Sequence, residues 1–248
     1  NTNQIITEPN EMKESLLKNY QRVHATRPPA NLETLPFLIN IQEIYDPNPD
    51  IDSNWYDLVT QPIDIDKLKQ IIKNLPTVKA PGITGENYET YKILADYQEA
   101  DSSMNIMLAL INNTLETGHI ANTDKTGRII LLPKDDEWLG SMSRLRPITL
   151  LEPYRKILEA IIQTRLQKTM NKHKLMDDLN FGFKKGYSTN EAITMIQVLV
   201  DIANSKTKHK TELYAAALDV SAAFDTVPFS ALEHSMNNLK FPLNLQRI

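Results

Sequence analysis

An apolar stretch that ends in a single acid carries the most chemically suggestive residues of this 248-residue chain. Residues 213–218 are hydrophobic or small, Asp219 follows them directly, and Phe224 stands a few positions later. A strand buried in a sheet cannot keep an acid along its length, but a carboxylate at its C-terminal end can meet solvent, metal and substrate. The pattern therefore indicates a metal-binding carboxylate, although an Asp after an apolar run is also typical of a cap or a turn.

Two β-type segments with basic ends form the second chemical pattern. Residues 127–134 and 144–151 are rich in β-branched and apolar side chains, and a polar loop separates them. An antiparallel pair with Lys134 and Arg146 at its open end could lie over a triphosphate and neutralise its charge. A surface hairpin with ordinary solvated Lys and Arg fits the same pattern. The acids at 135–137 are expected to point away from such a ligand.

The third pattern combines glycines, aromatic rings and lysines in residues 180–189, which read Asn-Phe-Gly-Phe-Lys-Lys-Gly-Tyr-Ser-Thr. In a loop placed against a nucleic-acid strand, rings stack on bases and cations hold phosphates. Basic residues on the polar side of the preceding helix, including Arg165, could follow a template backbone. They could equally form a solvated face.

The composition is that of a globular protein able to bury a core, because 41% of the residues are hydrophobic. The absence of cysteine excludes a disulfide scaffold and a thiolate metal site. No apolar run approaches membrane-spanning length, and the polar first residues are not a signal peptide.

The net charge of −4 argues against a nucleic-acid partner, but the charge is unevenly distributed. Residues 1–100 contain fifteen acids and nine bases, whereas residues 121–190 contain thirteen Lys and Arg and eight acids. This asymmetry favours one phosphate-binding face, although a solvated surface produces it nearly as often.

Apolar residues at helical spacing predict helices at 8–26, 64–75, about 88–94, 101–117, 153–170 and 188–203. Asp64 is expected to cap the second of them. Glu152 and Glu191 each stand three residues after a Thr or Ser, a spacing that predicts a capping box before each of the last two helices. Residues 27–61, rich in proline and acids, are expected to form a loop-rich connector.

Four segments, in this order, resemble motifs of reverse transcriptases from non-LTR (LINE-type) retrotransposons. They are Lys-Ala-Pro-Gly-Ile-Thr-Gly at 79–85, Leu-Pro-Lys with Arg-Pro-Ile-Thr-Leu-Leu between 132 and 151, the loop 180–189, and Leu-Asp-Val-Ser-Ala-Ala-Phe-Asp at 218–225. The resemblance covers most of the chain from about Asp64 onward. Thr84 stands where the family has Asp, and Asn180 and Lys184 stand where it has Gln and Arg.

The resemblance implies a role for each residue of the 218–225 motif that could do chemistry. Asp219 and the carbonyl of Val220 would be ligands of paired Mg²⁺ ions. Phe224 would be the steric gate that excludes a ribose 2′-hydroxyl and so favours DNA synthesis. The resemblance also favours a strand at 214–218, where three alanines would equally permit helix. Asp225 is expected to cap a helix that begins near Thr226.

The resemblance also implies ligand contacts elsewhere in the chain. Arg146 and Lys134 would bind the incoming nucleotide, and Arg128 would bind either its triphosphate or the template. The residues implied to bind nucleic acid are Gly182, Phe183, Lys184, Lys185 and Arg165.

Such a protein would have an α+β, right-hand polymerase fold, here incomplete, with helical fingers that carry a β-hairpin and the start of an antiparallel palm sheet. Residues 1–61 would be an N-terminal extension and linker, 62–205 the fingers region, and 206–248 the start of the palm. The family copies an RNA template by adding dNTPs to a DNA primer, and a retrotransposon enzyme is expected inside the cell, in cytoplasm and nucleus.

One carboxylate cannot hold two Mg²⁺ ions, and the later Asp-Asp motif of the family is absent from this chain. This polypeptide is therefore expected to be inactive alone, as a fragment of an RNA-directed DNA polymerase. The alternative is a catalytically dead, nucleic-acid-binding relic of a retrotransposon.

Overall fold

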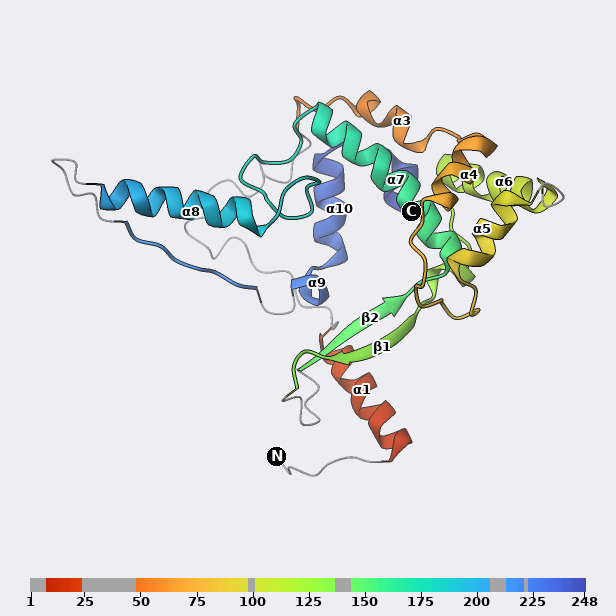
Figure 1. Cartoon of the computed structure of the whole chain (residues 1–248), viewed down its shortest axis with the longest axis horizontal. Coiled ribbons are helices and arrows are strands. Elements are labelled where there is room, and N and C mark those ends of the chain that lie inside the picture. Colours follow the sequence, from red (N-terminus) through yellow and green to blue (C-terminus); the bar gives the residue numbers. More distant parts are fainter. Residues whose placement is uncertain (1–7, 24–47, 98–100, 137–143, 206–212, 221–222) are drawn as a thin grey trace. The chain divides into compact units, whose positions relative to one another are not determined.

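The computed structural model describes residues 8–23, 48–97, 101–136, 144–205, 213–220 and 223–248. The chain divides into two compact units (Figure 1). Unit 1 comprises residues 1–167 and 224–248, and unit 2 comprises residues 168–223. In the described parts, helices predominate beside one antiparallel two-stranded sheet, so the predicted mixture of helix and antiparallel sheet is confirmed.

Most of the predicted helices form close to their expected bounds. The elements are α1 (Pro9–Val23), η2 (Ser53–Tyr56), α3 (Asp57–Thr60), α4 (Ile65–Lys73), α5 (Tyr88–Asp96), α6 (Asp101–Thr117), η4 (Asn122–Lys125), β1 (Arg128–Pro133), β2 (Leu145–Leu150), α7 (Pro153–Lys172), α8 (Thr189–Asn204), α9 (Ala223–Thr226), α10 (Phe229–Asn238) and α11 (Leu243–Arg247). Within these described ranges, no helix is both long and apolar enough to cross a membrane.

Local capping explains where several helices begin and end. The Asp64 carboxylate accepts a hydrogen bond from the Lys67 amide at 2.7 Å, which confirms the predicted cap of α4. Helix α6 ends at Gly118, whose φ of +72° is easily adopted only by glycine. The cap predicted for Asp225 is wrong, because Asp225 lies inside α9 and α10 begins after Pro228.

The core of unit 1 forms where the apolar faces of four helices meet. Helices α4, α5, α6 and the first half of α7 contribute its buried side chains. Those with at most 2% exposure are Leu68, Ile72, Met104, Ile111, Leu115, Ile157, Leu158 and Ile161. Burial of this apolar surface is the main source of stability for the unit.

Residues 48–60 are held against the C-terminal segment of unit 1. Tyr56 is fully buried, its hydroxyl donates to the Leu239 carbonyl at 2.8 Å, and its ring packs edge-on against Phe241. Burial raises the pKa of Tyr56 to about 12. Lys240 donates to the Ile51 carbonyl at 2.7 Å. The described part of the proline-rich connector therefore belongs to the folded unit.

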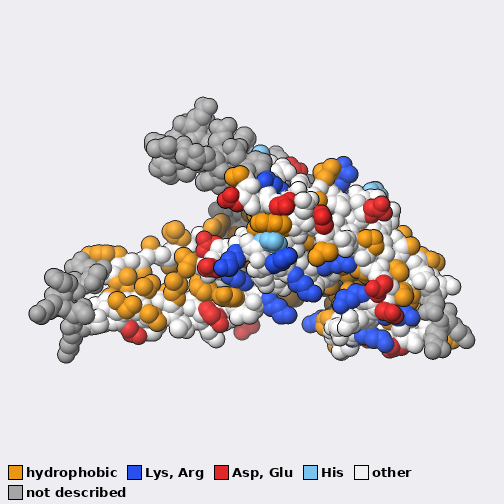
Figure 2. Space-filling view, turned by 90° about the horizontal axis from the view of Figure 1, so that it is seen from above, with side chains coloured by type: hydrophobic (Ala, Val, Ile, Leu, Met, Phe, Trp, Pro, Cys, Tyr) orange, Lys and Arg blue, Asp and Glu red, His pale blue; other side chains and the backbone are white. Residues whose placement is uncertain are grey.

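Unit 2 is far less well packed than unit 1. Helix α8 carries apolar side chains on several faces and has no buried residue, and hydrophobic side chains gather on the α8 part of the surface in Figure 2. Its most exposed large apolar residues are Ile193, Ile196 and Ile202. Its start is nevertheless well defined, because Ser188 and Glu191 form the predicted capping box.

The strand expected at 214–218 is not formed, and the expected start of a palm sheet is absent from the described residues. Residues 213–220 are exposed and have neither helical nor strand structure. Leu218, for example, is 96% exposed. A strand is stable only when a neighbouring strand satisfies its backbone groups, and β1 and β2 pair only with each other in the described structure.

Core packing in unit 1 predicts that two neighbouring side-chain truncations in α6 lower the free energy of unfolding by different amounts. Ile111→Ala removes fully buried atoms and is expected to lower the free energy of unfolding by about 2–5 kcal/mol. Leu110→Ala, at a position 54% exposed on the same helix, is expected to change it by less than about 1 kcal/mol. Urea denaturation of both variants measures the difference, and equal costs would contradict the assignment of the core.

Candidate nucleotide and nucleic-acid sites

Strands β1 and β2 form the hairpin that the sequence predicts. They pair antiparallel, with Arg128 opposite Leu150, Ile130 opposite Ile148, and Leu132 opposite Arg146. The pairing continues beyond β1, where the Lys134 amide donates to the Arg144 carbonyl at 2.8 Å. Figure 1 shows the two strands as neighbouring arrows, and the pair is called the ribbon below.

The register places all three predicted nucleotide-binding cations on one face of this ribbon. Opposed residues of an antiparallel pair point to the same side, and so do alternate residues along a strand. Arg128, Lys134 and Arg146 therefore share a face, and all three are exposed. The name basic face is used below for these three residues together with Arg144.

Arg144 is a fourth cation on the basic face, and the sequence reasoning did not single it out. It stands opposite Lys134 and two residues before Arg146, so strand alternation could have revealed it. Its guanidinium lies 3.6 Å from the Asp135 carboxylate. Asp135 was expected to point outward, but its carboxylate lies beside this arginine. Asp136 is exposed, and Glu137 lies outside the described residues.

A buried carboxylate connects the ribbon to the Pro-Gly loop at 81–85. Glu152, which follows β2 and is only 9% exposed, accepts hydrogen bonds from the Thr84 amide at 2.9 Å and the Thr84 hydroxyl at 2.7 Å. A Cβ atom at Gly82 would stand 2.6 Å from this carboxyl group, so only glycine allows the loop to come so close. Arg128 donates to the Ile83 carbonyl at 3.3 Å from the other side.

These contacts replace the capping box that was expected for Glu152. Thr149 lies in β2, opposite Ile129, and is not the N-cap of α7. Burial raises the pKa of Glu152, but the hydrogen bonds from Thr84 and the nearby Arg128 charge lower it more, so the pKa lies below the usual range. Thr84, which departs from the family pattern, therefore acts as a donor to Glu152.

The Arg165 side chain makes its hydrogen bonds within unit 1. Its guanidinium donates to the carbonyls of Val59 at 3.1 Å and Pro62 at 3.4 Å, and also to that of Gln61. Desolvation by burial lowers its pKa. These bonds attach α7 to the segment before α4, and any template contact of Arg165 would compete with them.

Residues 180–189 of unit 2, called the Gly-aromatic-Lys loop below, form a series of turns around Lys184. The Asn180 side chain accepts from the Gly182 amide at 3.0 Å, and Phe183 has a φ of +58° with 90% exposure. The Lys184 ammonium lies over the Tyr187 ring, 4.5 Å from its centre. Lys185 is exposed. The loop thus presents an aromatic ring and two lysines together.

Asp219 and Val220 lie in the exposed segment of unit 2, and the 83% exposed Phe224 begins the second part of unit 1. Residues 221 and 222 of the motif lie outside the described residues. Across the described ranges, no three His, Cys, Asp or Glu side chains are placed to hold a metal ion. The described residues thus supply one carboxylate and do not constitute a metal site by themselves.

Part of the chain matches a known protein family. The family described as reverse transcriptase (RNA-dependent DNA polymerase) matches residues 132–247, which include β2, the Gly-aromatic-Lys loop and Asp219. Residues 132–247 thus match part of a reverse transcriptase domain. The relatives below belong to mobile elements, which agrees with the resemblance to non-LTR retrotransposon enzymes that the motifs predicted.

Its relatives are polymerases of mobile elements. The RNA-directed DNA polymerase from mobile element jockey of Drosophila melanogaster is 27% identical over 183 residues, 74% of this chain and 19% of the relative. The probable RNA-directed DNA polymerase from transposon BS of the same fly is 29% identical over 193 residues, 75% and 19% of the two chains. A retrovirus-related Pol polyprotein from type-1 retrotransposable element R2 of Popillia japonica is 28% identical over 123 residues, which are 49% of this chain and 16% of the relative.

The aligned part of this chain spans about a fifth of the length of these first relatives. Enzymes of this family use divalent metal ions and bind an RNA template and a DNA primer. The roles predicted for individual residues of this chain stay predictions, because the similarity identifies the domain and not the contacts of its side chains.

The Thr84–Glu152 contact predicts an effect on stability that depends on pH. Thr84→Val removes the hydroxyl donor and is expected to cost about 1–3 kcal/mol at pH 7, the usual cost of a lost hydrogen bond to a buried charge. Since folding lowers the pKa of Glu152, this stabilisation is present above the unfolded pKa of about 4.3 and is lost as the pH falls through the folded pKa.

Urea denaturation of wild type and Thr84→Val at pH 7 and at acidic pH measures this dependence, and the two curves are expected to converge in acid. Thr123→Val, an exposed substitution of the same shape, is the control and should change little at either pH. A difference for Thr84→Val that stayed constant with pH would contradict the role of the carboxylate.

Proposed function

We propose that this segment works in an RNA-directed DNA polymerase that adds deoxynucleotides to a primer 3′ end. The single observation that carries the proposal is the basic face, where Arg128 and Arg146 of the two strands and Lys134 and Arg144 just beyond them lie on one side of the ribbon. Such a face attracts a polyphosphate and neutralises the charge that develops during phosphoryl transfer. The similarity to polymerases of mobile elements supports the same reaction.

Within this proposal, Arg146 and Arg144 contact the phosphates of the incoming dNTP, and Lys134 supports them at the tip of the ribbon. A guanidinium binds two phosphate oxygens at once, whereas an ammonium acts as a point charge. Arg128 stands at the opposite end of the ribbon and bonds to Ile83. It therefore joins the nucleotide site to the Pro-Gly loop as well as adding charge.

We further propose that Asp219 is one ligand of a Mg²⁺ pair, with the Val220 carbonyl beside it, and that Phe224 excludes the 2′-hydroxyl of ribonucleotides. Bound Mg²⁺ ions would lower the pKa of the primer 3′-hydroxyl and would hold the triphosphate in place. Asp219 is exposed at the end of an unpaired apolar segment, where it is accessible to ions and to additional ligands. This accessibility supports the assignment.

The right-hand arrangement belongs to the same proposal. Residues 62–205 would form the fingers region, 206–248 the start of the palm, and 1–61 an extension and linker. The RNA template would contact Gly182, Phe183, Lys184 and Lys185, with the protein acting in the cytoplasm and nucleus.

The basic face predicts how the 248-residue chain binds a deoxynucleoside triphosphate. Arg146→Ala and Arg144→Ala are each expected to raise the dissociation constant by about tenfold, which corresponds to one charged hydrogen bond of about 1.4 kcal/mol. Lys125→Ala, at an exposed position outside the ribbon, is the matched control. Fluorescence titration measures the constants, and equal effects of Lys125 and Arg146 would exclude a specific site on the ribbon.

The polymerase role is tested in the full-length protein that contains this segment. The wild type is expected to extend a primer on an RNA template in the presence of Mg²⁺. Asp219→Asn is expected to lose this activity, because the substitution keeps the shape of the side chain but removes its charge. Titration calorimetry in the presence of bound primer–template is expected to show that Asp219→Asn binds Mg²⁺ more weakly than the wild type does. RNA binding without synthesis by the wild type would favour the nucleic-acid-binding relic instead.

A further inference from the structure

The Lys184 side chain is largely buried, and its ammonium has no hydrogen-bond acceptor among the described residues. Only 13% of its side chain is exposed. Among the described residues, its charged contacts are an ion pair with Asp178 at 3.9 Å, too long for a hydrogen bond, and the face of the Tyr187 ring. An ammonium has three donors, and buried donors are normally satisfied. The side chain is therefore arranged to receive an acceptor from a ligand.

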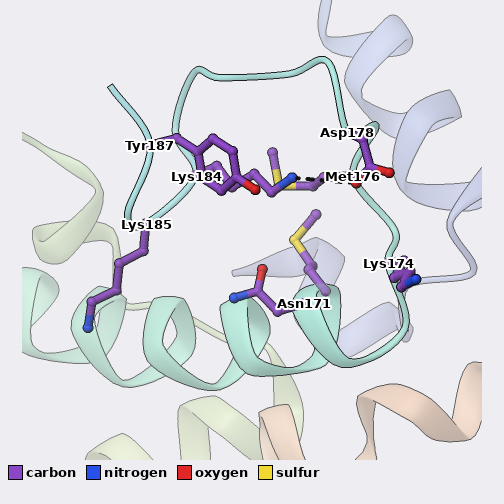
Figure 3. A pocket seen from close by; sticks show the side chains of 8 residues that line it. Asn171, Lys174, Met176, Asp178, Lys184, Lys185 and Tyr187 are labelled. Carbon is purple, nitrogen blue, oxygen red and sulfur yellow. Dashed lines mark ion pairs between the residues drawn. The ribbon is translucent and has the colours of Figure 1, made fainter. Parts of the chain in front are cut away.

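This ammonium lies at a cavity of about 230 Å³ within unit 2. The end of α7 contributes Met170 and Asn171, and the following turns contribute the remaining lining residues, Lys174, Met176, Asp178, Lys184, Lys185 and Tyr187. In Figure 3 the Asn171 side chain points from α7 toward the space below Lys184, and Asp178 lies beyond the Lys184 ammonium. The cavity is lined from two sides and opens to solvent.

The lining has two chemical parts that suit the two parts of a nucleotide. Three lysines stand against one acid, and that acid, Asp178, is 94% exposed, so its attraction for Lys184 is weak and screened by water. This part suits a phosphate. The Tyr187 ring and the thioethers of Met170 and Met176 form an apolar part, against which a flat base can stack or pack.

We propose that this cavity is a subsite for one nucleotide of a single-stranded nucleic acid, with the phosphate on Lys184 and the base against Tyr187. The proposal rests on the polymerase function above and adds Asn171, Lys174 and Tyr187 to the contacts expected of the loop. Lys174 and Asn171 supply further donors at the cavity wall. Asp178 is the one acid that lines the cavity, and its negative charge opposes the binding of a phosphate at Lys184.

The test measures binding of a fluorescent uridine homopolymer to the 248-residue chain at several salt concentrations. Lys184→Gln is expected to weaken binding and to reduce the slope of log affinity against log salt by about 0.7, the value for one phosphate contact on a single strand. Lys172→Gln makes the same charge change at an exposed position of α7 that does not line the cavity. It is expected to leave the slope nearly unchanged.

The variant Asp178→Asn distinguishes an effect on the proposed binding site from damage to the fold. Because this change removes the competing carboxylate, it is expected to tighten binding severalfold, a gain that misfolding would not produce. Tyr187→Leu is expected to weaken binding, whereas Tyr187→Phe should retain it, since the ring is preserved. A thymidine homopolymer tested in parallel shows whether the subsite distinguishes RNA from DNA.

The outcomes separate this proposal from the polymerase function. Equal loss of affinity in Lys184→Gln and Lys172→Gln, with no gain in Asp178→Asn, would overturn the subsite while nucleic-acid binding elsewhere on the chain remained. Absence of homopolymer binding by the wild type would also overturn it. Neither result bears on dNTP binding at the basic face, which is measured separately and uses different residues.

Discussion

The hydrogen bonds from Thr84 to Glu152 are the contact on which the arrangement of the ribbon and the Pro-Gly loop in unit 1 depends. A carboxylate this deeply buried is tolerated only when donors surround it, and the amide and hydroxyl of Thr84 provide them. Because Glu152 lies between β2 and α7, the same contact fixes the base of the ribbon, the start of the long helix and the Pro-Gly loop. Arg128 completes the arrangement through the Ile83 carbonyl.

The ribbon converts sequence spacing into a functional surface. Four cations that are scattered between positions 128 and 146 converge because antiparallel pairing places them on one face. A shift of the register by one residue would separate Arg146 from Arg128 and Lys134, since alternate residues of a strand point to opposite sides. The triphosphate recognition that we propose therefore depends on uncharged backbone hydrogen bonds, which set this register.

Unit 2 combines precise local structure with little packing. The capping box at Ser188 and the turns around Lys184 are satisfied by neighbours in sequence, so they form without a large core. The apolar residues of α8 and of 213–220 remain exposed. The loop that we propose to bind nucleic acid is thus built from short-range contacts, whereas the segment that carries Asp219 lacks a strand partner among the described residues.

The sequence alone determined what rests on local physics. Helix positions, the Asp64 and Ser188 caps, the hairpin at β1 and β2 and the family itself could be predicted, because periodicity, capping and motif order involve residues near one another in the chain. The roles of Glu152 and Arg165 and the cavity at Lys184 could not, since each depends on contacts between distant segments or on burial. The strand at 214–218 was predicted wrongly for the same reason: propensity and motif describe a segment, but only a hydrogen-bonded neighbour makes it a strand.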